Sequence, residues 1–167
     1  MFKRIGLLMV ILCLSPGLTY GAGYVIGTYG FGGPMDDISW GAEIGGVFLS
    51  DLHPPGGALS AAVGFSVGET DDDVPSTCPH PKKYDDGNEH EDYVICGAEF
   101  IPGFFGSVGL GYSTQKVVTI ASSGEIDSET EEHLTGMIGL RYVIQGFSTG
   151  IGFHTRRGIM VNAGIAF

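Results

Sequence analysis

Residues Gly158–Phe167 read GIMVNAGIAF, and this stretch decides the fold because it alternates as a β-strand does. Successive side chains of a strand point to opposite faces of the sheet. One face of this segment is wholly apolar and the other is small or polar. The apolar face carries Ile159, Val161, Ala163, Ile165 and Phe167. The segment is therefore predicted to be a strand that meets an apolar medium on one side and ends on an aromatic residue.

The amino terminus has the pattern of a cleavable export signal. Lys3 and Arg4 precede an apolar run, Ile5–Leu14, which is too short to span a membrane as a helix. Small residues follow, and we expect a signal peptide over residues 1–22, cut after Gly21 or Gly23. The alternative is the buried first helix of a soluble protein. An exported chain with such a strand points to a β-barrel of a bacterial outer membrane.

The composition limits the classes of function. The formal net charge is −11, and loss of Lys3 and Arg4 makes it −13, so nucleic acid is a poor partner. The chain has 29 glycines and is 43% hydrophobic, which does not fit a disordered acidic protein. Glycine recurs too often for long helices and suits curved strands with little room inside. Residues 23–167 are therefore expected to form one β domain.

Eight period-two segments bounded by turn signals are predicted to be strands. They lie at 23–31, 38–50, 58–68, 92–101, 104–115, 133–145, 147–154 and 159–167. An even number of strands with both termini in the periplasm puts alternate connections outside. The long acidic connections, 69–91 and 116–132, then face outward, while 51–57 and the tight turns at 102–103 and 145–146 face the periplasm. The sequence predicts an all-β, eight-stranded antiparallel up-and-down transmembrane barrel.

The side-chain phase provides a second test of the barrel. We place the charged strand residues Glu43, Glu99 and Arg141 in the lumen. The outward aromatic residues then gather at two heights, as two girdles around an apolar band. The periplasmic rim comprises Phe48, Phe100, Phe104, Tyr142, Phe147 and Phe167. The outer rim comprises Trp40, Phe65, Tyr112 and Phe153. A soluble β-sandwich or a lipocalin-like periplasmic barrel, the alternative folds, would have no such rims.

The chain resembles the small eight-stranded outer-membrane barrels of Gram-negative bacteria, of the OmpA-like and OmpX-like type. The resemblance covers the mature chain and rests on architecture, topology and the strand ending at Phe167, not on a motif of one subfamily. It implies insertion by the barrel-assembly machinery and contact with lipopolysaccharide. It implies no single activity, because such barrels include adhesive surface proteins, structural anchors and lipid-modifying enzymes.

The lumen is the first place to look for chemistry. Eight strands leave an interior that side chains can fill. We expect the lumen charges to pair, with Gln115, His133 and His154 nearer the outer end. Unpaired, the same groups could instead form a narrow ion path. A lipid A deacylase is not expected, because His154 lacks the His-x-Ser pattern of that family and points inward.

The connections offer weaker candidates. The segment 69–91 contains Cys78, His80 and several carboxylates, but their spacing fits no EF-hand or standard zinc motif. We expect a solvated acidic loop, and weak binding of a divalent cation is the alternative. Arg156-Arg157 is expected at the tip of the last outer connection, either on lipopolysaccharide phosphates or as a plain polar turn. Cys78 and Cys96 are the only cysteines after the signal. The oxidising periplasm favours their pairing, and the lipid-facing phase of Cys96 opposes it.

These observations together predict a monomeric outer-membrane barrel with acidic extracellular loops and a structural or surface-interaction role. We expect no catalysis and no cofactor. A narrow ion-permeable channel is the alternative, and a lipid-modifying enzyme is a more distant one.

Overall fold

The computed structural model describes residues 18–35, 38–50, 57–70, 82–85, 87–120, 126–144 and 146–167. Most of the expected signal peptide and the expected Cys78 thiol lie outside these ranges, so neither the signal peptide nor a disulfide bond is tested. Within the described ranges, no helix has the length and apolarity needed to cross a membrane.

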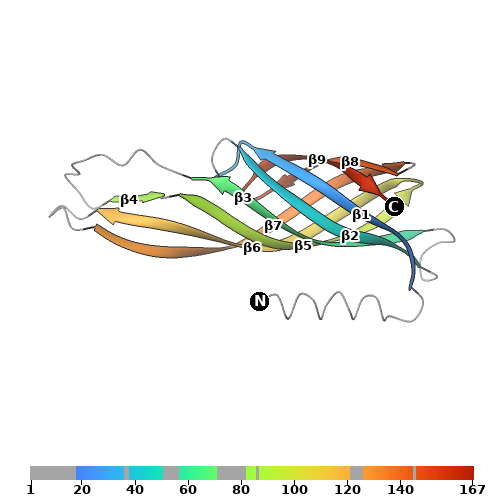
Figure 1. Cartoon of the computed structure of the whole chain (residues 1–167), viewed down its shortest axis with the longest axis horizontal. Coiled ribbons are helices and arrows are strands. Elements are labelled where there is room, and N and C mark those ends of the chain that lie inside the picture. The colour runs from blue at the N-terminus through green and yellow to red at the C-terminus, as the bar shows by residue number, and fades with distance from the viewer. Residues whose placement is uncertain are drawn as a thin grey trace.

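Eight antiparallel strands close into a barrel, and a ninth short strand extends one wall (Figure 1). The strands are β1 (Leu18–Phe31), β2 (Ser39–Ser50), β3 (Ala58–Glu69), β4 (Lys82–Asp85), β5 (Asn88–Ile101), β6 (Phe104–Ile120), β7 (Ile126–Ile144), β8 (Phe147–His154) and β9 (Gly158–Ala166). β1 pairs with β2 on one side and with β9 on the other, which closes the ring. Reciprocal backbone bonds between Gly23 and Phe167, of 2.7 and 2.8 Å, complete this seam. The predicted eight-stranded up-and-down barrel is confirmed.

The tight turn between β5 and β6 shows how local sequence sets the connections. Gly103 has φ 81°, a left-handed conformation that other residues adopt with strain. Its N–H donates to Glu99 Oε1 at 2.7 Å. The carboxylate of Glu99, which the sequence analysis assigns to the lumen, therefore caps this tight turn.

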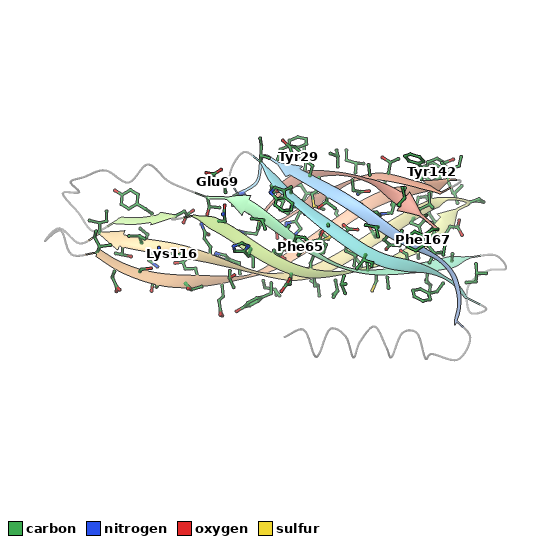
Figure 2. The ribbon with its side chains drawn as sticks, in the orientation of Figure 1. Tyr29, Phe65, Glu69, Lys116, Tyr142 and Phe167 are labelled. Atoms are coloured by element: carbon green, nitrogen blue, oxygen red, sulfur yellow. The ribbon has the colours of Figure 1, made fainter. Side chains whose placement is uncertain are left out.

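The two faces of the wall differ as the alternation predicts. Large apolar side chains on the outside are about half exposed, among them Ile44 at 58% and Val108 at 62%. Aromatic residues collect at two heights on this surface (Figure 2). Trp40 packs edge-on against Phe65 with ring centroids 6.3 Å apart, whereas at the other end Phe104 lies 4.4 Å from Tyr142. The two girdles are present.

One member of the periplasmic rim departs from its predicted place. Phe48 is only 6% exposed, although the alternation puts it on the outer surface. β1 begins at Leu18 rather than at residue 23, so its extra residues run beside the end of β2 and pair Tyr20 with Phe48. Phe48 is thus a buried residue and not an exposed member of the periplasmic rim.

The outer connections hold more strand than expected. β6 and β7 pair continuously from Phe104 and Tyr142 out to Ile120 and Ile126, well past the end of β8. β4 pairs with the outer part of β6, so that β4, β6 and β7 form a three-stranded sheet that projects from one side of the barrel (Figure 1). The expectation that 116–132 is a long loop is therefore wrong. The alternation of its residues was hidden by their polarity.

Candidate functional site: the polar lumen and its outer mouth

The inner half of the lumen holds a buried ion pair. Arg141 on β7 lies 2.5 Å from Glu43 on β2, and both side chains are at most 6% exposed. Tyr93 donates its hydroxyl to the same carboxylate at 3.5 Å, and the Arg141 guanidinium stacks 5.0 Å from the centre of the Tyr24 ring. A buried charge needs a partner and hydrogen bonds to offset desolvation. These contacts join four strands across the lumen.

A second carboxylate, Glu91 on β5, occupies the lumen nearer the outer end and is 3% exposed. It accepts hydrogen bonds from Ser66 on β3, at 2.8 Å, and from Thr135 on β7. His154 Nε2, on β8, lies 2.8 Å from its Oε1. Three strands thus converge on one buried acid.

The contacts of His154 fix its tautomer. Nδ1 accepts the backbone N–H groups of Arg156 and Arg157, each at 3.1 Å. A nitrogen that accepts carries no proton, so in the neutral ring the proton is on Nε2 and is donated to Glu91. The imidazole therefore holds the β8–β9 turn on one side and the buried carboxylate on the other.

The turn after His154 sends both of its arginine side chains into the barrel mouth. Arg156 donates hydrogen bonds to Glu89 through two nitrogens, with Nε to Oε1 at 2.9 Å and Nη2 to Oε2 at 2.5 Å. Its Nη2 also donates to Gln115 Oε1 at 2.9 Å. Glu89 is fully buried and the Arg156 side chain is 18% exposed. The expectation that this arginine projects outward is wrong.

Arg157 is buried more deeply than its neighbour, with no exposed surface. Its Nε donates to Ser39 at 3.0 Å and its Nη2 to Thr28 at 2.9 Å, while Nη1 has no hydrogen-bond partner. This side chain also contradicts the prediction of an exposed polar turn. Both arginine side chains of this turn are thus held by residues of other strands, Arg156 by Glu89 and Arg157 by Ser39 and Thr28.

No family model matches the sequence. Nor does any curated protein match it significantly. Among solved structures, similar chains include Ail, the attachment invasion locus protein of Yersinia pestis, alone and with the heparin analogue sucrose octasulfate. The complex is 12% identical over 87% of this chain and 99% of that one, with a TM-score of 0.47; Ail alone is 11% identical over 92% and 100%, also at 0.47. Neisserial surface protein A is 13% identical over 87% and 95%, at 0.43.

The surface of the barrel itself defines its environment. An apolar belt between two aromatic girdles surrounds an interior of paired charges, the reverse of a soluble protein. A closed barrel satisfies its backbone hydrogen bonds within the wall, which is what permits strands to stand in hydrocarbon. Even strand number, short turns at one end and an outward apolar band are the features of bacterial outer-membrane barrels. The protein is an outer-membrane β-barrel.

The sequence predicted part of the lumen correctly. Glu43 and Arg141 form the expected pair, and His154 and Gln115 lie in the outer half, both buried. His133 faces the lumen partly buried, and its Nε2 has no partner. Two carboxylates that contact the turn, Glu89 and Glu91, were missed because the predicted strand began only at residue 92.

The chemistry open to the lumen is limited by these bonds. The ring nitrogens of His154 are both engaged, and its carboxylate partner accepts from two hydroxyl groups as well. Within the described ranges, no group of three His, Cys, Asp or Glu side chains is arranged to hold a metal ion. Cys96 is exposed on the outer face of β5, the lipid-facing phase that the sequence predicts.

Proposed function

We propose that this protein is a non-enzymatic surface barrel that binds an extended, basic polypeptide segment along its projecting sheet. The observation that carries the proposal is the free edge of β7. β8 pairs with β7 only from Met137 to Ile144, and the β8–β9 turn contacts it at Gly136. Beyond that point, no described strand pairs with the outer edge of β7.

An unpaired strand edge is a template for another strand. Alternate N–H and C=O groups along Ile126–Thr135 point away from β6, and an extended peptide can add to them by main-chain hydrogen bonds. Most side chains along this segment are exposed, including Ile126 at 69% and Leu134 at 81%. The edge stands beyond the end of β8, outside the membrane belt.

The charge of this edge selects the partner. Residues 126–132 read IDSETEE and contain four acidic side chains and no basic one. Two of them, Glu129 and Glu131, share the ammonium of Lys83, at 2.6 and 2.7 Å, which leaves the strand acidic. A second copy of the same edge would oppose carboxylate to carboxylate, which is unfavourable across a strand pair. A basic segment is complementary in charge.

The lumen supports a structural rather than a conducting or catalytic role. The Glu43–Arg141 and Glu91–His154 contacts each join two strands that are not neighbours around the barrel. Charged pairs held in this way stabilise the barrel and leave the recognition surface outside.

The test uses the full barrel in lipid nanodiscs and an alternating lysine–valine peptide as probe. We expect the peptide to protect the backbone amides of Ile126–Thr135 from hydrogen exchange. Replacing Asp127 and Glu132 by their amides should weaken binding about ten-fold, because charge complementarity both accelerates and stabilises the encounter. These two side chains are chosen because neither contacts Lys83 in the projecting sheet.

The matched controls separate backbone pairing from general electrostatic attraction. A peptide methylated at alternate backbone nitrogens keeps its charge but cannot pair, and it should give no protection. An alternating glutamate–valine peptide should not bind. Equal binding of the methylated peptide, or protection of β8 rather than β7, would refute strand addition.

A further inference from the structure

The wall of the barrel contains a break where β4 gives way to β5. β5 pairs with β6 as far as His90 opposite Thr114, and β4 resumes the pairing at Asp85 opposite Val117. Two residues of β6, Gln115 and Lys116, lie between these pairs, whereas the chain between Asp85 and His90 is longer. Such a bulge bends the strand and re-aims side chains, and bulges concentrate at barrel rims and beside sites.

The break is fixed in place by Gly87. This residue has φ 90°, and its carbonyl accepts both the N–H and the hydroxyl of Thr70, at 2.8 and 2.9 Å. Thr70 is 5% exposed, so the anchor is shielded from water. The left-handed conformation of Gly87 and its two hydrogen bonds from Thr70 hold the backbone at this break in one defined conformation.

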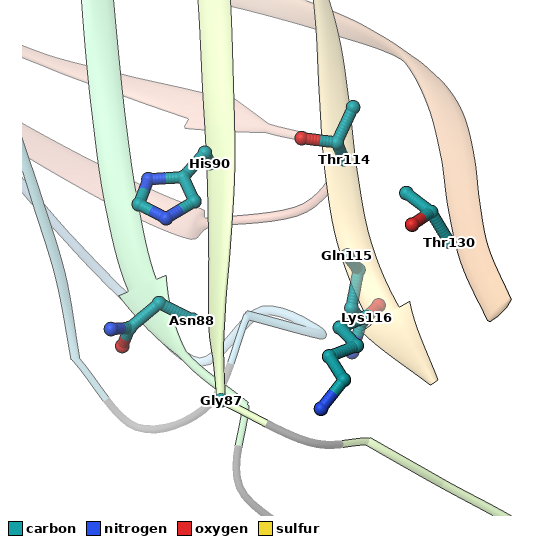
Figure 3. Close-up of a pocket in the computed structure, with 7 residues that line it drawn as sticks. All are labelled: Gly87, Asn88, His90, Thr114, Gln115, Lys116 and Thr130. Carbon is teal, nitrogen blue, oxygen red and sulfur yellow. The ribbon is translucent and has the colours of Figure 1, made fainter. Parts of the chain in front are cut away.

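A pocket of about 420 Å³ opens at this break (Figure 3). Besides Gly87, its lining residues carry polar groups on partly apolar side chains and come from three strands: Asn88 and His90 of β5, Thr114, Gln115 and Lys116 of β6, and Thr130 of β7. Its volume is within the range of small-ligand sites.

Gln115 lines the pocket and also contacts Arg156 of the β8–β9 turn. The residue is 3% exposed, and its Oε1 accepts from Arg156. Its Nε2 is buried and has no hydrogen-bond partner. A buried amide donor left unpaired is costly, so the site provides a bond for a group that enters it.

We propose that this pocket binds a sugar residue of the lipopolysaccharide that surrounds the barrel. Amide, hydroxyl and imidazole groups supply mixed donors and acceptors, which suit the hydroxyl groups of a sugar. Glu132, which pairs with Thr114 across β6 and β7, makes the site poor for an isolated phosphate. Tyr112, two residues below Thr114 on the same face, belongs to the outer aromatic girdle. The pocket therefore stands at the height of the innermost sugars of the outer leaflet.

This inference rests on the outer-membrane setting but not on strand addition to β7. The experiment uses the full barrel in nanodiscs without lipopolysaccharide. The probe is core oligosaccharide released from lipopolysaccharide by mild acid, and backbone amide shifts are followed by NMR. We expect saturable shifts at Gly87, Asn88, Thr114 and Lys116, with β7 beyond Thr130 unaffected.

The double variant T114V/T130V removes two hydroxyl groups while keeping side-chain shape. It should bind the oligosaccharide about ten-fold more weakly, as expected for the loss of two hydrogen bonds. T149V, on β8 opposite Tyr142 and so near the periplasmic end of the barrel, is the control and should bind as the parent does. Unchanged affinity of the double variant, shifts elsewhere on the barrel, or an equal response to inorganic phosphate would overturn the proposal. A failure of peptide binding at β7 would leave these results unaffected.

Discussion

His154 Nε2 on β8 lies 2.8 Å from Glu91 Oε1 on β5, across the lumen and 63 residues away in sequence. Two strands separate these residues around the ring, so the contact joins walls that are not neighbours. Because Nδ1 of the same ring holds two backbone N–H groups of the β8–β9 turn, the position of the turn depends on a carboxylate on the far wall. The His154 imidazole therefore connects the β8–β9 turn to a carboxylate on β5.

His154→Ala should destabilise the barrel by about 1–3 kcal/mol, since Glu91 would lose a donor while remaining buried. The change can be measured by urea unfolding in lipid vesicles. His90→Ala, on the exposed outer face, is the matched control and should leave the midpoint unchanged. ¹⁵N spectra of the parent should show the proton on Nε2. A proton on Nδ1 would contradict the hydrogen bonds assigned to the ring.

Arg141→Ala should cost about 3–5 kcal/mol, because it leaves Glu43 charged and alone in the lumen. The double variant with Glu43→Gln removes the stranded charge, and we expect it to recover part of the loss. Unfolding midpoints in the same vesicles compare the three proteins. If the double variant is no more stable than Arg141→Ala, the two residues are not coupled as the ion pair requires.

Arg156→Ala should also destabilise the barrel, by up to about 3–5 kcal/mol, because Glu89 is fully buried and takes two of its bonds from this guanidinium. Lys83→Ala removes a cation from the projecting sheet and should leave the global midpoint unchanged. A midpoint for Arg156→Ala equal to that of Lys83→Ala would mean that the turn is not held in the mouth.

The projecting sheet should loosen in acid. The hydrogen bond from Lys83 holds the pKa of Glu131 below its ordinary range, and Glu129 and Glu131 raise the pKa of Lys83. A lowered carboxyl pKa stabilises the sheet fully above about 4.3, and this contribution is lost as the pH falls further. The raised pKa of Lys83 acts in the opposite direction, in strong alkali.

Amide protection factors of Tyr84 and Asp85, corrected for the intrinsic exchange rate, measure this dependence. They should fall below about pH 4 in the parent. In Lys83→Met the fall should be absent, and high salt should reduce it in the parent because both groups are exposed. A protection profile that is flat in the parent would show that the ion pair does not hold β4.

The β6–β7 hairpin should resist a glutamate-specific protease in folded protein. Its acidic residues, Glu129, Glu131 and Glu132, lie within a strand paired to β6 along its whole length. Cleavage needs an extended, unpaired backbone. Mass spectrometry of the digest should find these sites cut only after boiling. Cleavage of unboiled protein there would favour the loop expected from the sequence.

The sequence predicted the membrane part of the fold because the bilayer imposes a strict pattern on it. An apolar residue at every second position, as in β9, is visible without a structure. The outer part of β7 was not predicted because residues 126–130 are exposed on both faces of the strand, so Asp127 and Glu129 show no such alternation. Glu89 and Glu91 lie four and two residues before Tyr93 and so share its inward face, and this spacing could have predicted that both carboxylates point into the lumen. The inward direction of Arg156 and Arg157 had no local signal, since it depends on Glu89 and on the hydroxyl groups of Ser39 and Thr28, all far away in the chain.

The unequal height of the wall gives the molecule a front and a back. A barrel of even height would present the same profile to its neighbours however it rotated about the membrane normal. Here β4, β6 and β7 rise on one side, and β8 stops at His154 on the other. A molecule that approaches along the membrane plane therefore meets either the projecting sheet or the lower side of the barrel at β8. Rotation of the protein in the bilayer becomes a variable that crowding in the outer leaflet can control.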